Sequence, residues 1–339
     1  MEKGDKIISL VTGGAGFIGS FLCGELLKAG HRVICVDNFS TGHVRNIEPY
    51  LRNPDFQFLR HDIVEPLELD KFPELEPFKV KFLGVQEIYH LATPNTITHF
   101  EDRQIDTLLV NSVGTRHVLD LAVKYKAPIV LGSSAVVYGK EKEDGQIFKE
   151  DDQGVVNHLA PRSCYEEGKR FAETMFYTYS RAHGIDAKIA RIFHAYGPRM
   201  PLFDGHLIPD MILAALNNEP IQLPGGGDAT TSLVYVLDIV DGLLRMMSGK
   251  EKIGPVNLGS DQRLAWQVIA ERIVELTGSE STIVAGTDSA LNGIGMPDIS
   301  KAKSQLGWMP VVLLDDGLQK TIDYIKANKL LLTGDAQAA

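Results

Sequence analysis

The sequence predicts an α/β protein, built on a doubly wound parallel sheet with a smaller, discontinuous α/β lobe. Two observations support this fold class. Short apolar runs of strand length, the first at 7–11, alternate with longer segments of helical periodicity, the first at 17–30, through the first half of the 339-residue chain. Strands separated by helices run parallel, because each crossover returns the chain to the same end of the sheet.

The other elements follow from the same patterns. Buried-strand runs continue at 32–37, 56–60, 87–92, 128–134, 186–193 and 232–236. A long helical stretch covers 104–126, and helical patterns return near 264–278 and 314–327. The segment 65–85 has mixed charges, three prolines and no clean period, so we interpret it as an insertion whose role the sequence does not indicate.

The domain boundaries are set by a proline- and glycine-rich stretch that follows RIFHAYGPRM, at 191–200. We expect a sheet domain and a smaller substrate lobe, each made of two segments, and a disordered tail. The predicted sheet domain comprises 1–194 and 228–262, the lobe comprises 195–227 and 263–330, and the tail is 331–339.

The charge balance is acidic, with 34 Lys and Arg residues against 44 Asp and Glu residues. This balance argues against a nucleic-acid partner or an anionic membrane surface. No apolar run approaches the roughly 18 residues of a membrane span, and the N-terminal segment lacks a signal-peptide cleavage pattern. Cys23, Cys35 and Cys164 are too scattered for a disulfide framework, and the histidines show no metal-ligand spacing. We therefore expect a reduced, cytoplasmic protein without a metal ion.

A glycine-rich turn lies between the first strand and the first helix. The stretch VTGGAGFIGS places Gly14, Gly16 and Gly19 in GxGxxG spacing, with Gly13 as an additional glycine. In this context the glycines allow a tight turn and a close approach of the backbone to a pyrophosphate, which faces the N terminus of the helix. The pattern predicts a Rossmann-type dinucleotide-binding domain.

An acidic residue ends the second strand. Asp37 lies 18 residues after Gly19, where a carboxylate binds both hydroxyls of an adenosine ribose. A 2′-phosphate at this position would meet a like charge, so NAD is favoured over NADP. Arg45 is close enough in the sequence to leave NADP use open.

Tyr165 and Lys169 are four residues apart in PRSCYEEGKR (161–170), a predicted surface helix. Residues with this spacing share a helix face, so the phenol and the ammonium can enter one pocket. A free phenol has a pKa of about 10, and a nearby ammonium lowers this pKa toward the range of a general base. The spacing alone is also typical of two solvated side chains. The strand end LGSSAVVYG (131–139) favours a catalytic pair, because it brings Ser134 to the carboxyl edge of the sheet, where ligands bind.

Together these motifs resemble a known family. VTGGAGFIGS, SSAVVYG, YEEGK and RIFHAYGPRM are similar to motifs of the extended short-chain dehydrogenases/reductases that act on nucleotide sugars. Within that group, PRSCYEEGKRFAETM and PDISKAKSQLGWMP most resemble the UDP-glucuronate decarboxylases, which make UDP-xylose. The resemblance covers nearly the whole chain and implies tightly held NAD and a nucleotide-sugar substrate, with UDP as the expected nucleotide.

The resemblance also implies roles for individual residues. By this resemblance Tyr165 takes the proton from the sugar C4 hydroxyl, Ser134 hydrogen-bonds the same hydroxyl, and Lys169 tunes Tyr165 and holds the nicotinamide ribose. The C4 hydroxyl becomes a ketone, from which the later chemistry follows. The expected cofactor-binding residues are Gly13, Gly16, Phe17, Ile18, Gly19, Asp37, Asn38, Thr41, Gly42, Asp62, Ile63, Leu91, Ala92, Thr93, Asn111, Tyr165 and Lys169. The expected substrate-binding residues are Ser134, Ala135, His194, Arg199 and Arg263.

Four positions depart from the decarboxylase pattern. Val136 replaces a glutamate and Thr231 replaces an arginine, and those groups are associated with decarboxylation or with the anionic groups of the substrate. Met296 stands where a basic residue is usual, and His194 where an asparagine is usual. SSAVVYG is instead similar to the strand end of UDP-hexose 4-epimerases. A UDP-sugar 4-epimerase is therefore the alternative. A non-catalytic module that binds NAD and a nucleotide is a third hypothesis, which the retained catalytic residues disfavour.

A homodimer is the predicted assembly. We expect it to form through the helices that begin near Asn111 and Tyr165. The faces of these helices away from the sheet are predicted to carry apolar surface that a monomer does not usually expose. That surface comprises Leu119, Val123, Phe176 and Tyr179.

Overall fold

The computed structural model describes residues 6–95, 101–140, 146–224, 229–249, 253–286 and 295–338. A seven-stranded parallel sheet forms its centre, with the strand order β12-β7-β5-β4-β1-β2-β3. The sheet strands are β1 (Ile8–Thr12), β2 (Arg32–Asp37), β3 (Phe56–Arg60), β4 (Glu87–His90), β5 (Ile129–Ser134), β7 (Ala187–Ile192) and β12 (Val256–Leu258). The order reverses between β1 and β4, which confirms the predicted doubly wound sheet.

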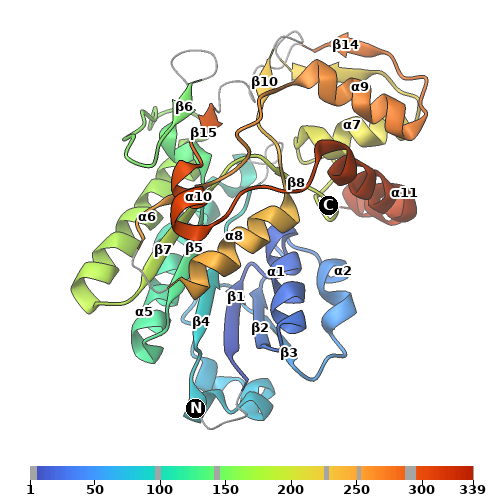
Figure 1. Cartoon of the computed structure of the whole chain (residues 1–339). Coiled ribbons are helices and arrows are strands. Elements are labelled where there is room, and N and C mark those ends of the chain that lie inside the picture. Colours follow the sequence, from blue (N-terminus) through green and yellow to red (C-terminus); the bar gives the residue numbers. More distant parts are fainter. Residues whose placement is uncertain are drawn as a thin grey trace.

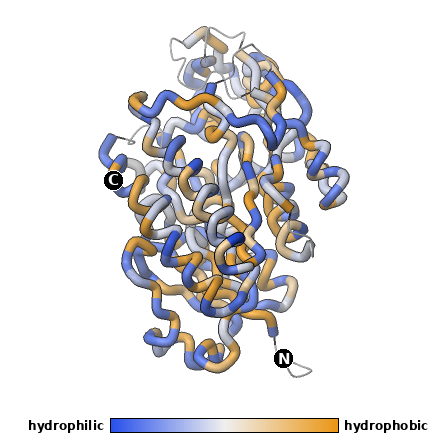
Figure 2. The backbone as a smooth tube through the Cα atoms, turned by 90° about the vertical axis from the view of Figure 1, so that its left-hand side faces the viewer, coloured by the Kyte–Doolittle hydropathy of each residue, from blue (hydrophilic) through white to orange (hydrophobic). Residues whose placement is uncertain are grey.

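Helices cover both faces of the sheet (Figure 1). One layer contains α5 (Thr115–Tyr125) and α6 (Ser163–His183), and the opposite layer contains α1 (Phe17–Lys28), α8 (Val236–Ser248) and α10 (Ser300–Leu306). Successive strand residues point to opposite faces, so Leu10 packs with the first layer and Val11 with the second. Apolar and hydrophilic stretches alternate along the helices, as expected where one side of each helix is buried (Figure 2).

Shorter elements connect the layers. They are the α-helices α2 (Val44–Ile47), α3 (Val80–Leu83) and α4 (Gln104–Leu109), the 3₁₀ turns Glu48–Tyr50, Leu69–Lys71, Pro73–Phe78, Glu101–Arg103 and Ala135–Tyr138, and the π-helix Val110–Gly114. The π-helix joins α4 to α5, so these three segments form one continuous helical rod. Such π-helical turns are frequent at functional sites.

A smaller lobe lies above the carboxyl edge of the sheet (Figure 1). It is built on α7 (Leu207–Leu216), α9 (Trp266–Thr277) and α11 (Leu314–Ala338), which share a hydrophobic cluster of their own. Four two-stranded pairs accompany the lobe and the loops beside it. They are β8 (Ala195–Tyr196) with β11 (Val234–Tyr235), β9 (Ile221–Leu223) with β14 (Ile283–Ala285), β10 (Thr230–Thr231) with β13 (Leu264–Ala265), and β6 (Ile147–Phe148) with β15 (Met296–Pro297).

One predicted strand of the central sheet is wrong. The run at 232–236 contributes only the two residues of β11, which pair with β8 outside the central sheet. The chain then turns at once into α8 at Val236. The seventh sheet position is taken by β12, which pairs with β7 through Val256, Asn257 and Leu258. A three-residue strand with a central asparagine is too short to form the apolar run by which the other strands were predicted.

The C-terminal end also differs from the prediction. Helix α11 continues to Ala338, where the sequence analysis predicts a disordered tail from 331. Leu332 is buried against the cluster of the smaller lobe, together with Leu318, Ile322 and Ile325 of the same helix. The helical period therefore continues beyond the last residue that the sequence pattern assigns to it.

The insertion at 65–85 completes the core under one layer. Leu69, Leu75 and Phe78 are almost fully buried and belong to the cluster that contains Leu10 and Val118. The short turns of this segment thus cover apolar surface beside α5. Its role is structural packing of the sheet domain.

The apolar face that we predicted for a dimer is wrong. Leu119 and Phe176 are fully buried, and Val123 and Tyr179 pack against the same cluster, so all four side chains face the core of this chain. These residues are apolar because their helices cover the sheet. The exposed apolar residues of α4, the π-helix and α6 include Ile105, Leu108, Leu109, Val113, Phe171 and Tyr177.

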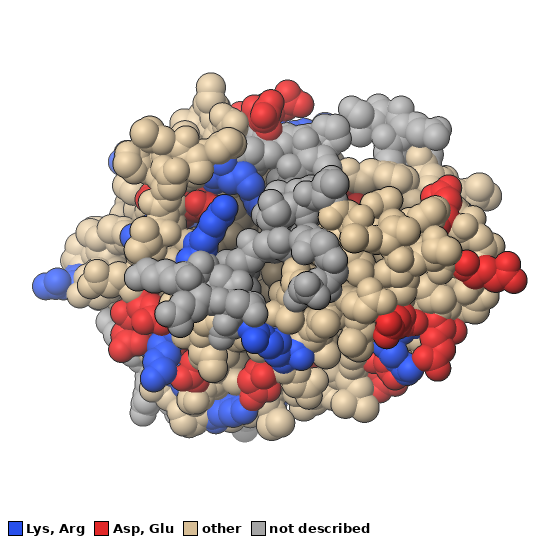
Figure 3. All heavy atoms as spheres, turned by 90° about the horizontal axis from the view of Figure 1, so that it is seen from above, with Lys and Arg blue, Asp and Glu red and all other residues tan. Residues whose placement is uncertain are grey.

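The surface has mixed charge where it can be seen from above. Both basic and acidic side chains are scattered over that face, and the acidic ones predominate on its right-hand rim (Figure 3). Within the described ranges, no helix is both long and apolar enough to cross a membrane.

Candidate active site

A groove lies along the carboxyl edge of the sheet, where the strand order reverses between β1 and β4. It consists of two adjoining cavities that share the lining residues Gly13, Gly16, Thr41, Leu91 and Thr93. The first cavity extends to the end of β2, and the second extends to α6 and the smaller lobe. A crevice at this point of a doubly wound sheet is the usual ligand site.

The glycine turn forms the floor between the two cavities. Gly13 has φ +73°, a conformation that side chains rarely adopt, and its N–H donates to the Val36 carbonyl at 2.8 Å. A Cβ on Gly13 would lie 2.7 Å from the Ala92 nitrogen, and a Cβ on Gly19 would lie 2.1 Å from the Gly13 oxygen. Both positions therefore accept only glycine without movement of the backbone.

Helix α1 begins beside this turn. Its first helical hydrogen bond runs from the Ser20 N–H to the Gly16 oxygen, at 3.1 Å. The N–H groups of Phe17, Ile18 and Gly19 precede this bond, so they have no acceptor within the helix. The positive end of the helix dipole and these N–H groups suit an anion in the groove.

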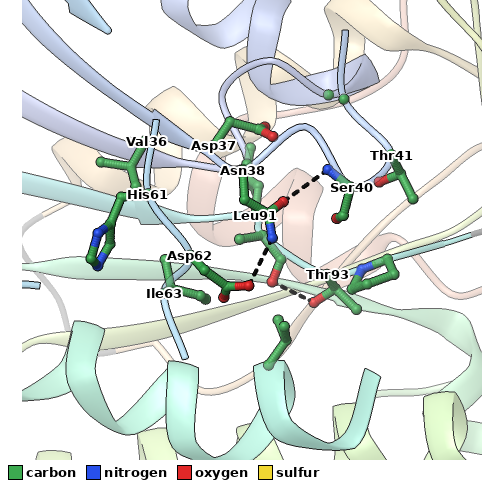
Figure 4. Close-up of a pocket in the computed structure, with 16 residues that line it drawn as sticks. Val36, Asp37, Asn38, Ser40, Thr41, His61, Asp62, Ile63, Leu91 and Thr93 are labelled. Carbon is green, nitrogen blue, oxygen red and sulfur yellow. Dashed lines mark hydrogen bonds between the residues drawn. The ribbon is translucent and has the colours of Figure 1, made fainter. Parts of the chain in front are cut away.

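Two carboxylates line the far end of the first cavity. Asp37 accepts hydrogen bonds from the N–H groups of Ala15, at 3.0 Å, and Phe39, at 2.8 Å. Burial raises the pKa of Asp37, and these two bonds oppose the rise. Asn38 links the second carboxylate to the loop, because its amide donates to Asp62 at 2.9 Å and its oxygen accepts from the Ser40 N–H at 2.9 Å (Figure 4).

Lys169 is held at the junction of the two cavities. Its Nζ atom donates to the Gly132 carbonyl at 2.8 Å and to Thr93 Oγ1 at 2.9 Å. Thr93 Oγ1 also lies 3.2 Å from Asn111 Oδ1, and the Asn111 amide donates to the Thr107 carbonyl at 2.8 Å. Asn111 lies in the π-helix, and the extra residue of that turn brings its side chain to this network.

Tyr165 and Ser134 meet in the second cavity. Burial raises the pKa of Tyr165, and the Ser134 hydrogen bond and the charge of Arg162 oppose the rise. The Lys169 ammonium lies 5.9 Å from the centroid of the Tyr165 ring. Burial lowers the pKa of Lys169 to about 7. The structure therefore brings together the three residues that the sequence predicts as catalytic.

The part of the second cavity beside α6 and the smaller lobe contains polar groups of several elements. Ala135, His194 and His206 line it, and Arg162 enters it from the start of α6. His194 Nδ1 lies 2.6 Å from Thr231 Oγ1, and burial lowers the pKa of His194 to about 4. Arg162 and His206 are absent from the predicted site. Arg162 lies three residues before Tyr165 in PRSCYEEGKR, and this proximity was the available signal.

Two predicted substrate residues do not line either cavity. Arg199 instead stacks on the ring of Phe21, with 4.5 Å between the guanidinium carbon and the ring centroid. It also donates to the Tyr50 hydroxyl at 3.4 Å. Arg263 is exposed and lies outside the lining of both cavities. Their positions in the sequence pattern did not show which arginines face the groove.

The other predicted cofactor residues line the groove. The first cavity includes Asn38, Thr41, Gly42, Asp62, Ile63, Leu91, Ala92 and Thr93, and the second includes Phe17, Ile18 and Gly19.

A model of the NAD dependent epimerase/dehydratase family matches residues 9–259, which include all of these positions. The chain belongs to this family.

Members of the epimerase/dehydratase family with known activities resemble the chain over most of its length. UDP-glucuronic acid decarboxylase 1 of Xenopus tropicalis is 40% identical over 96% of this chain and 73% of its own length. UDP-glucuronic acid decarboxylase 1 of Arabidopsis thaliana is 38% identical over 95% of this chain and 70% of its own length.

Solved structures of this family share the fold. The UDP-glucuronic acid 4-epimerase of Bacillus cereus, in complex with UDP-glucuronic acid and NAD, has a TM-score of 0.80 and 28% identity, covering 95% of this chain and 99% of its own. An epimerase of Methanothermobacter thermautotrophicus has a TM-score of 0.84 and 29% identity, covering 97% of this chain and 95% of its own.

NAD is the cofactor of this epimerase/dehydratase family member, and the groove fits it. A Cβ on Gly13 or Gly19 would be too close to the protein's own backbone, so these glycines allow the tight turn that lines the groove, and the N terminus of α1 stands beside it, where it suits a pyrophosphate. The Asp37 carboxylate ends β2 at the distance along the chain that suits an adenosine ribose. These features come from the residues of this chain alone.

Proposed function

We propose that this protein is an NAD-dependent UDP-glucuronate decarboxylase. The observation that carries the proposal is the group of Ser134, Tyr165 and Lys169 in one cavity, directly beside the glycine turn of the NAD groove. The 40% identity with a UDP-glucuronic acid decarboxylase over 96% of this chain supports the choice of substrate.

Each of the three residues has a role in this proposal. Tyr165 accepts the proton of the sugar C4 hydroxyl. Ser134 hydrogen-bonds the phenol of Tyr165 and also orients the C4 hydroxyl. Burial opposes ionisation of Tyr165, so a neighbouring positive charge is needed. The charge of Arg162 lowers the pKa of Tyr165, and we assign the same effect to Lys169, the lysine of α6, whose ammonium lies 5.9 Å from the ring centroid. NAD, when bound, accepts a hydride from C4 and later returns it.

Loss of carbon dioxide then follows from the chemistry of the sugar. A carboxylate that is β to a ketone leaves as CO₂ because the ketone accepts the electron pair as an enolate. Protonation of C5 restores the ketone, which is reduced to the C4 hydroxyl of UDP-xylose. These reaction steps do not require the glutamate that Val136 replaces.

The alternative is a UDP-sugar 4-epimerase. The apolar wall that Ala135 and Val136 form beside Tyr165 favours it, because it places no acid near the ketone and leaves space for the sugar to turn. In this case the hydride returns to the opposite face of C4, and the carboxylate stays in place.

Incubation of the NAD-loaded protein with UDP-glucuronate in deuterated water tests the two functions. We expect carbon dioxide and UDP-xylose that carries one deuterium at C5, because the enolate takes its proton from solvent. Mass spectrometry of the nucleotide sugar measures this label. Recovery of the 4-epimer, with its carboxylate and without deuterium at carbon, would show that the protein is an epimerase instead.

The nucleotide and the cellular location complete the proposal. We assign the UDP part to the smaller lobe, because the second cavity continues from Tyr165 to Leu207, Ile208 and Trp266 of that lobe. A reducing compartment such as the cytoplasm is supported by the three cysteines, which are all free and buried.

We also propose a homodimer, now through the outer face of α4 and α6. Ile105, Leu108 and Phe171 are exposed on these packed helices and form apolar surface that a second copy would cover. We expect the parent protein to sediment with twice the 37.3-kDa chain mass, and Phe171→Glu to sediment as a single chain. Phe82→Glu is the matched control, because Phe82 is also exposed but lies in α3. A parent protein that sediments as a single chain would contradict the dimer.

A further inference from the structure

Arg162 has an unsatisfied donor in the wall of the second cavity. It is the residue that precedes α6, and its side chain makes no capping hydrogen bond with the helix. Its Nε atom is buried and has no hydrogen-bond partner among the described residues. Neighbouring arginines differ in this respect. Arg191 is bound by the Glu173 carboxylate, and Arg170 donates to the carbonyl groups of Val137 and Gln153.

The charge of Arg162 acts on groups from several sides of the cavity. It lowers the pKa of Tyr165, on α6, and it disfavours protonation of His194, after β7, and of His206, before α7. Desolvation lowers the pKa of both histidines, so they supply no positive charge at neutral pH. Lys169 donates to the Gly132 carbonyl and to Thr93. Among the described residues that line this cavity, Arg162 is thus the side chain that keeps its charge and has a buried N–H without an acceptor.

A buried guanidinium N–H without an acceptor is unfavourable, and an arginine does not lose its proton to avoid this cost. An anionic group of the ligand removes the cost, and a carboxylate can accept two parallel N–H bonds from one guanidinium. The unsatisfied donor of Arg162 therefore indicates an anionic group at this end of the bound ligand.

A nucleotide uronate offers two anionic groups, and their positions on the sugar differ. The diphosphate is attached at C1, across the ring from C4, whereas the carboxylate is attached at C5, which is bonded to C4. Tyr165 and Ser134 receive the C4 hydroxyl in the function proposed above. Arg162 lines the same cavity as Tyr165 and its charge acts on Tyr165, so its guanidinium is close to the C4 end of the sugar, where the carboxylate is the anionic group.

We propose that Arg162 binds the C5 carboxylate of the substrate and thereby selects acidic nucleotide sugars over neutral ones. This inference rests on the proposed function, because it requires the C4 hydroxyl to be held at Tyr165. Thr231 cannot supply the charge, because a hydroxyl is neutral, and its Oγ1 atom lies 2.6 Å from His194 Nδ1. Arg162 holds the carboxylate until it leaves as CO₂. The Nε–H group of Arg162 is then again free to bind the carboxylate of the next acidic substrate.

The experiment compares the parent protein with Arg162→Gln, Arg162→Lys and the control Arg181→Gln. Arg181 lies on the same helix but in its last turn, over the ring of Tyr177, so its replacement makes the same change in net charge away from the cavity. Isothermal titration of each NAD-loaded variant uses UDP-glucuronate, UDP-glucose and UDP.

We expect the parent protein and Arg181→Gln to bind UDP-glucuronate at least tenfold more tightly than UDP-glucose. Arg162→Gln should lose at least tenfold in affinity for UDP-glucuronate, while its affinities for UDP-glucose and UDP change less than twofold. Arg162→Lys should retain part of the preference, because it keeps the charge without the planar fork. A purely structural role of Arg162 would change the three affinities together.

Three results would overturn the inference. They are equal losses for all three ligands in Arg162→Gln, unchanged affinity for UDP-glucuronate in Arg162→Gln, and a parent protein that does not prefer UDP-glucuronate to UDP-glucose. Release of carbon dioxide is measured separately in the parent protein. Charge-selective binding without carbon dioxide would leave the inference intact and reject the decarboxylase function.

Discussion

Tyr165→Phe is expected to lose about two to four orders of magnitude in turnover, the usual contribution of a positioned general base. The substitution removes one hydroxyl from a buried ring that lies beside Lys169 and Ser134, and it leaves the rest of the ring in place. Folding and NAD binding should therefore stay nearly unchanged. Lys169→Met should cause a similar loss and should also weaken NAD binding. The measurements are kcat with UDP-glucuronate and the NAD content of the purified variants.

Tyr177→Phe is the matched control for this prediction. Tyr177 lies on the same helix and is 61% exposed, so the same chemical change is made on the outer surface of α6. The double variant at 165 and 169 should lose far less than the product of the two single losses, because residues that act as a unit are not additive. Equal rates for Tyr165→Phe and the parent protein would remove Tyr165 from the mechanism.

Gly13→Ala is expected to abolish NAD binding and to destabilise the fold. The new methyl group would lie 2.7 Å from the Ala92 nitrogen and 2.8 Å from the Leu91 carbonyl carbon, and backbone atoms cannot move aside as a side chain can. We expect the clash to lower the free energy of unfolding by about 1–3 kcal/mol. The left-handed conformation, with φ +73°, should add about 1–2 kcal/mol for a residue with a side chain. Urea unfolding and the NAD content of the purified protein measure the two effects.

Gly30→Ala separates these two contributions. Gly30 has φ +85°, but a Cβ on it would meet no atom within 4 Å. Gly30→Ala should therefore show only the conformational cost and should bind NAD like the parent protein. If both variants unfold at the same urea concentration and contain the same amount of NAD, the close approach of the glycine turn to the loop after β4 does not contribute to stability or to NAD binding.

Local patterns in the sequence determined most of the sheet and the catalytic group. Short apolar runs predicted six of the seven central strands, because a strand that is covered by helix layers on both faces is apolar along its length. The GxGxxG turn predicted the dinucleotide groove, because the glycines that a tight turn and a close pyrophosphate require all lie within about ten residues of chain. The helical repeat was enough to predict that Tyr165 and Lys169 share one face of α6. The end of β5 was enough to predict that Ser134 lies at the carboxyl edge of the sheet.

Tertiary structure alone decided which polar residues face the groove. Arg199 matched a family pattern, yet its guanidinium is held by Phe21 and Tyr50, which are distant in the sequence. Arg162 matched no prediction, yet it enters the cavity with an unsatisfied donor. The edge strand β12 likewise depends on β7 for its pairing. Long-range packing determines the partner of each such group, and the identity of a residue and its neighbours in the chain contain no record of that partner.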